Sequence, residues 1–402
     1  MDKNLIRDNI LKLGSIGKSA SGGVNRTFGS EYLKLAQTFV KAYMQEAGMV
    51  SWIDSIGNVH GVYKCRDSSA KTILTGSHID TVQEGGILDG VLGVVAAVEC
   101  VRELSINKIA LKNNIHVIAT TGEEGNELGG TVGSRAMMGS INYEEFNFLQ
   151  KAKKFGLEEA AFKNAILDIT DIKCYLELHI EQGNTLDNDK CDIGIVSGIV
   201  GLQRYLLKIK GMSNHAGTTM MRYRKDAMVD AARVILTIDS LARAIGHNFV
   251  ATVGKLEVFP NAVAVIPGLV ELVLEFRSQD SRLMELFIEM VKTSVKEFAD
   301  VDFSLLVKKR PVNCSAKLIT CIESVCSKEN INYRIMPSGA THDGNAMALK
   351  MPIGMLFVPS KGGISHSSLE YTEWDNIYKG VEVLYKTLRK LGESDEDISY
   401  KS

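Results

Sequence analysis

The sequence has few of the features that mark specialised protein classes. Its seven cysteines include no C-x-x-C pair, so neither a disulfide framework nor a thiolate zinc site is expected. Its apolar runs fall short of the roughly 18 residues that a transmembrane helix needs, and its N-terminus lacks the apolar core of a signal peptide. With 46 Lys and Arg against 48 Asp and Glu, no excess of charge favours nucleic acid or an anionic membrane as a partner. These absences predict a cytoplasmic globular protein whose partner is a small molecule.

The length of 402 residues exceeds what one hydrophobic core usually sustains, so two domains are expected. Strand-like and helical patterns alternate over residues 1–199 and again over residues 312–402, which predicts an α/β domain with a mostly parallel sheet. Between them, residues 200–311 show the order strand, helix, strand, strand, helix, strand. That order is typical of a ferredoxin-like α+β domain, so this segment is predicted to be an insertion into the first domain.

Two adjacent glutamates, Glu123 and Glu124, follow the apolar and β-branched residues 114–122. Such a run predicts a buried strand, so the pair places two negative charges at the mouth of an α/β sheet. Two carboxylates that close raise each other's pKa unless they share a cation or a proton. The pair therefore indicates a metal site in which one glutamate binds and the other handles protons.

Further nitrogen and oxygen ligands stand at other predicted strand ends or helix starts: His78, Asp89, His179 and His366. Because strands of an α/β sheet present ligands at their carboxyl ends, these side chains are expected to meet. Each has an ordinary alternative when it is judged alone. Asp89 could cap the apolar helix that follows it, His179 could be a satisfied core histidine, and the glutamate pair could be a solvated turn. Asp80, two positions after His78, is expected to orient the histidine ring.

Three other polar positions carry a chemical and an ordinary interpretation. His215 lies in a loop of glycines and hydroxyl residues and would contact an oxyanion or merely form a turn. Arg277 ends the predicted strand 269–276 and would grip a carboxylate with two hydrogen bonds or remain a surface arginine. His342 and Asp343 form a further polar cluster in a loop after a strand.

Seven motifs in order link these positions: TGSHIDTV at 75–82, DG at 89–90, EEG at 123–125, HIEQG at 179–183, NHAGTT at 214–219, SGATHD at 338–343 and ISH at 364–366. Together they resemble the amidase/hydantoinase/carbamoylase branch of the dinuclear-metal aminoacylase and carboxypeptidase superfamily, across about residues 25–390. That branch includes allantoate amidohydrolases and N-carbamoyl-L-amino acid hydrolases.

The resemblance implies two divalent ions, zinc, manganese or cobalt, and five ligands: His78, Asp89, Glu124, His179 and His366. Asp89 would bridge the ions. His78 and His179 would bind one ion, and Glu124 and His366 would bind the other. Glu123 would be the general acid and base. Asp80 would contact His78 on the side of its ring that faces away from the metal ions. Nitrogen and oxygen ligands do not choose among these metals.

The resemblance also implies that the inserted domain is a lid and the dimerisation module of a homodimer. His215 would reach across the dimer towards the active site of the partner. The substrate's carboxylate and ureido groups would contact five residues: Gln182, His215, Asn261, Arg277 and His342. The implied reaction is hydrolysis of a ureido C–N bond in allantoate or an N-carbamoyl-L-amino acid, with release of ammonia and carbon dioxide.

Two positions depart from the pattern of the branch. Ala264 stands where the branch usually has an asparagine that helps to hold the substrate carboxylate, and Met220 stands where proline usually follows the motif around His215. These departures leave the substrate contacts open. An aminoacylase or dipeptidase of the wider superfamily, or a catalytically silent binding protein on the same fold, are the alternative functions.

Overall fold

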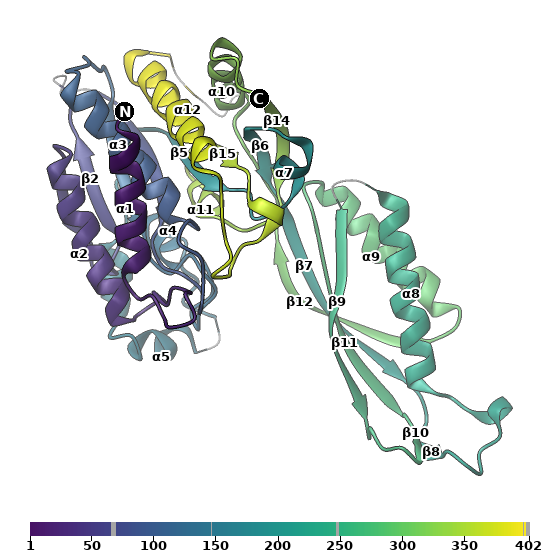
Figure 1. The fold of residues 1–402 in the computed structure, drawn as a ribbon. Helices are drawn as coiled ribbons and strands as arrows, with labels where there is room; N and C mark the ends of the chain where they lie inside the picture. Colours follow the sequence, from purple (N-terminus) through teal and green to yellow (C-terminus); the bar gives the residue numbers. More distant parts are fainter. Residues whose placement is uncertain (66–69, 146, 247–248, 397, 399–402) are drawn as a thin grey trace. The chain divides into compact units, whose positions relative to one another are not determined.

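The computed structural model describes residues 1–65, 70–145, 147–246, 249–396 and 398 (Figure 1). The chain divides into two compact units. The first unit combines Met1–Ser197 with Cys314–Ser402, and the second unit is the intervening segment Gly198–Asn313. Within the described ranges, no helix has both the length and the hydropathy that crossing a membrane demands.

The first unit is built on a sheet in which the strands are ordered β1-β2-β4-β3-β5-β15-β6, with β14 beside β6. Their bounds are β1 (Val50–Ile53), β2 (Val59–Tyr63), β3 (Thr72–His78), β4 (Asn114–Thr120), β5 (Ile172–Ile180), β6 (Ile193–Ile199), β14 (Tyr333–Ser338) and β15 (Ile353–Val358). The central strands β4, β3, β5 and β15 run parallel. The pairs β1–β2, β2–β4 and β15–β6 at the flanks are antiparallel. The predicted α/β fold is confirmed, and its parallel part is the centre of the sheet.

Five longer helices and the sheet share the main hydrophobic core: α1 (Lys3–Ser15), α2 (Glu31–Glu46), α3 (Val91–Ile106), α10 (Ala316–Lys328) and α12 (Trp374–Glu393). The sequence of α3 is apolar along most of its length because the helix packs against β3, β5 and α12. Gly93 permits the closest approach, since a Cβ at this position would lie 2.4 Å from the carbonyl oxygen of Leu178 in β5.

Short helices complete the first unit: α4 (Val132–Met137), α5 (Phe148–Lys153), α6 (Glu159–Asn164), α7 (Thr185–Asp189), α11 (Gly344–Met347) and the 3-10 turn η2 (Lys361–Gly363). The first three form a second apolar cluster around Phe148 and Phe162. Each of these three helices has six residues, which is too short to show a clear amphipathic period in the sequence.

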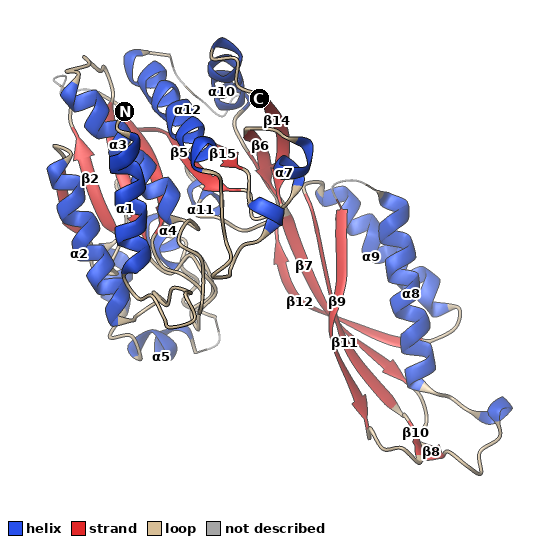
Figure 2. Ribbon diagram, viewed as in Figure 1, coloured by secondary structure: helices blue, strands red, loops and turns tan. Residues whose placement is uncertain are grey.

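The second unit has a four-stranded antiparallel sheet of order β12-β7-β11-β9. Its main elements are β7 (Gly201–Lys210), α8 (Ala227–Ile245), β9 (Phe249–Phe259), β11 (Leu269–Ser278), α9 (Ser281–Lys296) and β12 (Asp300–Lys309). Figure 2 shows α8 and α9 beside these strands, and their apolar residues share one core with alternate residues of β7 and β11. The predicted ferredoxin-like order is confirmed.

Small elements complete the second unit: β8 (Asn214–His215), the 3-10 turn η1 (Met221–Tyr223), β10 (Val265–Ile266) and β13 (Val312–Asn313). Strands β8 and β10 pair with each other, and His215 lies opposite Val265. Strand β13 pairs with the last residues of β6, so the two segments that connect the units run side by side.

Candidate metal centre

The carboxyl ends of the central parallel strands carry the candidate ligands to one edge of the sheet. His78 is the last residue of β3, and His179 is the penultimate residue of β5. Glu123 and Glu124 follow β4, and the loop after β15 carries His366. Asp89 lies just before α3, which packs on the same strands. This is the edge at which parallel α/β sheets bind ligands.

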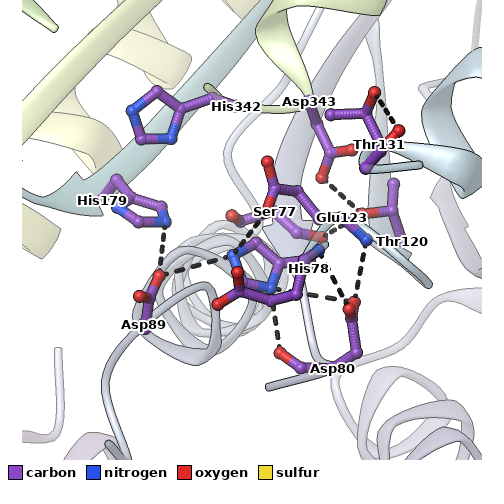
Figure 3. Close-up of polar contacts among 12 residues, drawn as sticks. Ser77, His78, Asp80, Asp89, Thr120, Glu123, Thr131, His179, His342 and Asp343 are labelled. Carbon is purple, nitrogen blue, oxygen red and sulfur yellow. Dashed lines mark hydrogen bonds and ion pairs between the residues drawn. The ribbon is translucent and has the colours of Figure 1, made fainter. Parts of the chain in front are cut away.

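One group of ligand atoms surrounds Oδ1 of Asp89. This oxygen lies 3.5 Å from Nε2 of His78 and 3.1 Å from Nε2 of His179, and all three residues are buried (Figure 3). Among the described residues, Oδ1 of Asp89 and Nε2 of His179 have no hydrogen-bond partner. Buried polar atoms are rarely left unpaired, and a cation between two imidazoles and a carboxylate would satisfy them. The residues therefore fit a divalent metal ion.

A second group surrounds the other oxygen of the same carboxylate. Oδ2 of Asp89 lies 3.3 Å from Nε2 of His366, which in turn lies 3.3 Å from Oε1 of Glu124. These three residues form another candidate metal group. The two oxygens of Asp89 thus face two different sets of ligands, as a bridging carboxylate requires. The structure brings together all five ligands that the resemblance implies.

The alternative of Asp89 as a helix cap is not seen. Gly90, with φ of 68°, occupies the N-cap of α3, and the carboxylate of Asp89 points to the histidines instead. Gly90 is required for a second reason, because a Cβ at this position would lie 2.5 Å from Nδ1 of His78. The turn between Asp89 and α3 therefore leaves room for the histidine ring.

The carboxylates of the centre shift the pKa values of the neighbouring histidines upward, which favours protonated imidazoles when no cation is bound. Burial alone would raise the pKa of Asp89, but the close contacts of its carboxylate with His179, His366 and His78 hold that pKa well below its usual range. Hydrogen bonds to Asp89 and Glu124 raise the pKa of His366 to about 10. Burial lowers the pKa of His78, yet its contacts with Asp89 and Glu123 raise that pKa well above its ordinary value. A divalent cation would replace these protons, since metal-binding imidazoles must be neutral.

Glu123 is suited to carry a proton. Its carboxyl group is buried, and Oε2 lies 3.9 Å from Nε2 of His78. Burial raises the pKa of Glu123 well above its usual value; the charge of His78 opposes this rise, and the carboxylates of Asp343 and Glu124 add to it. A carboxyl group whose pKa is raised towards neutrality can accept a proton and return it in one reaction cycle.

Asp80 supports the centre differently from the sequence-based expectation. Its backbone carbonyl, 3.0 Å from Nδ1 of His78, orients that ring, while its carboxylate oxygen Oδ1 lies 3.8 Å away. The carboxylate instead accepts hydrogen bonds from the backbone N–H groups of Glu123 and Glu124 (Figure 3). Asp80 thus connects the loop that follows β3 to the loop that follows β4.

A backbone clamp next to Glu123 was not predicted from the sequence. The N–H groups of Thr131, Val132 and Gly133 donate to the carbonyls of Glu123, Gly122 and Thr121, each at 2.8 Å. Thr131 has a φ of 57°, which is rare for a β-branched residue. No sequence motif signalled this clamp, because its partners pair through the backbone.

Two buried carboxylates lie close to the histidines; Asp343 belongs to the predicted polar cluster, whereas Glu177 was not singled out from the sequence. Glu177 accepts a hydrogen bond from Ser77 at 2.7 Å, and Asp343 accepts one from Thr120. Oε2 of Glu177 and Oδ1 of Asp343 are buried and have no partner among the described residues. The alternation of β5 contained a signal for Glu177, because it lies two positions before His179 and therefore on the same face.

Two of the expected substrate-binding residues lie in this centre. Nε2 of Gln182 donates to Oδ2 of Asp89 at 2.8 Å, and its Oε1 is buried without a partner among the described residues. His342 lies with its ring 4.6 Å from that of His179, and its Nε2 is 2.8 Å from the hydroxyl oxygen of Ser338. Burial holds the pKa of His342 well below its ordinary value, so this ring is neutral.

The other three expected substrate-binding residues, His215, Asn261 and Arg277, belong to the second unit. His215 is exposed, and its Nδ1 accepts hydrogen bonds from two backbone N–H groups that follow it, at 3.0 and 3.3 Å. A neutral His215 therefore carries its proton on Nε2. Asn261 has a left-handed φ of 55°. Arg277 donates from Nε and Nη2 to Oε1 of Glu275, at 3.0 and 2.8 Å, so Glu275 orients its guanidinium group.

Residues 74–390 match peptidase family M20/M25/M40. The chain belongs to this family. As a member of M20/M25/M40, it is 36% identical over 400 residues to an N-carbamoyl-L-amino acid amidohydrolase of Geobacillus stearothermophilus, covering 96% of this chain and 98% of that protein. It is 33% identical over 403 residues to an allantoate amidohydrolase of Escherichia coli, covering 97% of this chain and 98% of that protein.

Solved structures show the same relationship. An amidase of the hydantoinase/carbamoylase family from Burkholderia multivorans superposes with a TM-score of 0.89 at 26% identity, covering 98% of each chain. A second such amidase, from Burkholderia phymatum, has a TM-score of 0.86 at 29% identity, covering 98% of each chain. The predicted relationship to this branch of M20/M25/M40 is confirmed, and so is the prediction of an enzyme that hydrolyses carbon–nitrogen bonds.

Proposed function

We propose that this enzyme is a two-metal amidohydrolase that cleaves a ureido C–N bond in a small carboxylate substrate, allantoate or an N-carbamoyl-L-amino acid. The observation that carries the proposal is the carboxylate of Asp89, whose two oxygens face separate ligand groups. The relatives named above act on these two kinds of substrate, and both contain the ureido group.

The proposed ligands divide around Asp89. His78 and His179 would hold one ion, and Glu124 and His366 would hold the other. Zinc, manganese and cobalt all suit imidazole and carboxylate ligands. When bound, the two ions would polarise the carbamoyl oxygen of the substrate and favour deprotonation of the attacking water.

The residues of the chain supply the proton transfers. The buried carboxylate of Glu123 would accept the proton of the attacking water and deliver it to the nitrogen that leaves. Asp80 and the backbone clamp of residues 131–133 would hold Glu123 in place during both transfers. Addition of one water to R–NH–CO–NH2 releases ammonia, and loss of carbon dioxide from the carbamate then leaves the amine.

The second unit would complete the substrate site as a lid and as the dimerisation module of a homodimer. The Nε2–H of His215 would stabilise the oxyanion that forms at the carbamoyl carbon. Arg277, oriented by Glu275, and Asn261 would bind the substrate carboxylate. Gln182 and His342, which lie next to the proposed ligands, would contact the ureido group.

A substrate panel on metal-reconstituted protein tests the proposal. Allantoate and several N-carbamoyl-L-amino acids are compared with N-acyl amino acids and dipeptides, while bound metal is counted by elemental analysis. We expect two ions per chain, turnover of ureido substrates, and loss of turnover after chelation that divalent ions restore. Preference for acyl amino acids or dipeptides would favour an aminoacylase or dipeptidase. Fewer than two ions and no turnover would favour a silent binding protein.

A further inference from the structure

Glu370 is a buried carboxylate that lies in the loop after His366 and contacts the segment around Asp89. It is 6% exposed. Its Oε1 accepts hydrogen bonds from the backbone N–H groups of Leu88 and Asp89, at 2.8 and 3.1 Å. These donors precede α3 and lie more than 280 positions earlier in the chain. Leaving a buried N–H group without an acceptor is unfavourable, so this contact fixes the backbone of Asp89.

The other oxygen of Glu370 connects to the loop that carries His366. Oε2 lies 3.0 Å from the hydroxyl of Ser365, and the same hydroxyl lies 3.1 Å from Oδ2 of Asp89. Ser365 is the residue immediately before His366. One carboxylate thus fixes the backbone of the ligand that both proposed ions share, and it also anchors the neighbour of a ligand to the second ion.

The chain leaves room for this carboxylate at Gly86. A Cβ on Gly86 would lie 2.0 Å from Oε1 of Glu370 and 2.2 Å from its carboxyl carbon. Gly86 does not have a left-handed backbone that would itself demand glycine. The space that a side chain at position 86 would fill is therefore occupied by the carboxyl group of Glu370. This supports a specific role for the location of that carboxyl group.

We propose that Glu370 is a positioning residue that holds Asp89 and His366 at the separation that two metal ions require. The inference rests on the proposed two-metal function. Glu370 is in none of the candidate metal groups of the described residues, and it acts through the backbone of Asp89 and through Ser365. Loss of such supporting contacts typically weakens metal affinity about 10- to 100-fold.

The test measures Co²⁺ affinity and the visible d–d absorption of bound Co²⁺, at a temperature at which circular dichroism shows each variant folded. Glu370→Ala is expected to bind Co²⁺ roughly 10- to 100-fold more weakly, with a changed absorption band. Glu370→Gln is expected to stay close to the wild type. Its amide oxygen can still accept from Leu88 and Asp89, and its NH2 group can donate to Ser365. Wild-type Co²⁺ affinity in Glu370→Gln would show that Glu370 acts through its hydrogen bonds and not through its negative charge.

One further variant, with two controls, keeps the test decisive if Glu370→Ala does not fold. Gly86→Ala displaces the carboxylate without removing it and is expected to weaken Co²⁺ binding in the same way. Its matched control is Gly254→Ala, because a Cβ at Gly254 meets no atom within 4 Å. Glu99→Ala is the control for loss of a buried glutamate. Glu99 is 3% exposed and accepts hydrogen bonds from Tyr43 and Arg102, which are not proposed ligands.

Folded Glu370→Ala and Gly86→Ala variants with wild-type Co²⁺ affinity and an unchanged band would overturn the inference and leave the proposed function standing. A wild-type protein that takes up no Co²⁺ and hydrolyses no ureido substrate would overturn both. Weaker binding in the Gly254→Ala or Glu99→Ala control, equal to that of Glu370→Ala, would also overturn the inference, because the effect would then be general destabilisation.

Discussion

The carboxylate of Asp80 accepts a hydrogen bond from the backbone N–H of Glu123, at 3.2 Å. Its second oxygen accepts one from the backbone N–H of Glu124, at 3.1 Å. One buried side chain therefore sets the backbone of the proposed proton carrier and of a proposed metal ligand at the same time. The two side chains contact different histidines, Glu123 next to His78 and Glu124 next to His366, so each can take a different role.

Asp80→Asn is expected to lower kcat about 10- to 100-fold, the range typical of residues that orient a metal site. Asparagine has one acceptor oxygen, and its NH2 group would face the second backbone N–H. The measurement is kcat at saturating metal, with bound metal counted in parallel. Asp54→Asn is the matched control, because Oδ1 of Asp54 also accepts several backbone N–H bonds, from Ile56, Gly57 and Asn58. Equal losses of kcat in the two variants would contradict the role of Asp80.

Glu123→Gln is expected to lower kcat by about 10²- to 10⁴-fold, the usual contribution of a general acid and base. The amide keeps the shape of the side chain but cannot accept a proton. Bound metal should remain at the wild-type level, because Glu123 is not among the proposed ligands. Turnover and elemental analysis on the same preparation check both statements. Full activity in this variant would remove Glu123 from the mechanism.

His116 is expected to make the fold sensitive to acid. Burial, and to a smaller extent the charge of His60, lower the pKa of His116 to about 3. The unfolded chain takes up this proton below about pH 6.5, whereas the folded protein does not until about pH 3. The stability that the folded protein gains from keeping His116 neutral is therefore fully present above the pKa that His116 has in the unfolded chain, and it is lost as the pH falls below that pKa. The free energy of unfolding should drop by about 2 kcal/mol from this residue between about pH 7.5 and about pH 5.

Urea unfolding of the wild type and of His116→Gln at several pH values checks this statement. The variant lacks the titrating group, so the difference in unfolding free energy between the two proteins should change by about 2 kcal/mol over the same pH interval. Parallel curves for the two proteins would show that His116 does not carry the acid sensitivity.

Ala264→Asn is expected to retune substrate binding. The carbonyl of Ala264 accepts from the N–H of Ala216, next to His215, at 2.9 Å. An asparagine here would add a donor for a substrate carboxylate. A hydrogen bond to a charged group contributes about 1.5–3 kcal/mol, so KM for carboxylate substrates should fall roughly tenfold or more while kcat stays constant. Ala262→Asn, an exposed position in the same loop, is the control. An unchanged KM in Ala264→Asn would contradict this prediction.

Regular elements with a clear period were predicted closely from the sequence. The predicted strands 114–122 and 269–276 begin at the first residues of β4 (Asn114–Thr120) and β11 (Leu269–Ser278), and their ends differ from the observed ends by two residues. Among the longer elements, helix α1 and strand β6 were not predicted. Helix α1 is polar on much of its surface, so its helical form owes much to packing of Ile6, Ile10 and Leu13 in the core. Strand β6 contains two glycines, which weaken a strand pattern.

The proposed ligands were accessible to sequence reasoning because each follows a recognisable strand or precedes a recognisable helix. The supporting residues were not, for a physical reason. Thr131 acts through its backbone, and Glu370 acts through contacts with a segment far away in the chain. Such contacts exist only after folding, and neither residue type is unusual in its local sequence. The side chain of Asp80 was expected to serve His78, and only the geometry shows that it serves the two glutamates.

Gln182 and His366 share a left-handed backbone, with φ of 59° and 54°. A non-glycine residue in this conformation costs on the order of 1 kcal/mol. Both positions lie beside Asp89, where glycine would be the easier residue for the backbone. Replacing both residues with glycine to relieve this strain would therefore raise the melting temperature but remove a proposed metal ligand and a proposed substrate contact. In this enzyme, the strained backbone positions Gln182 and His366 should therefore be left unchanged when stability is engineered.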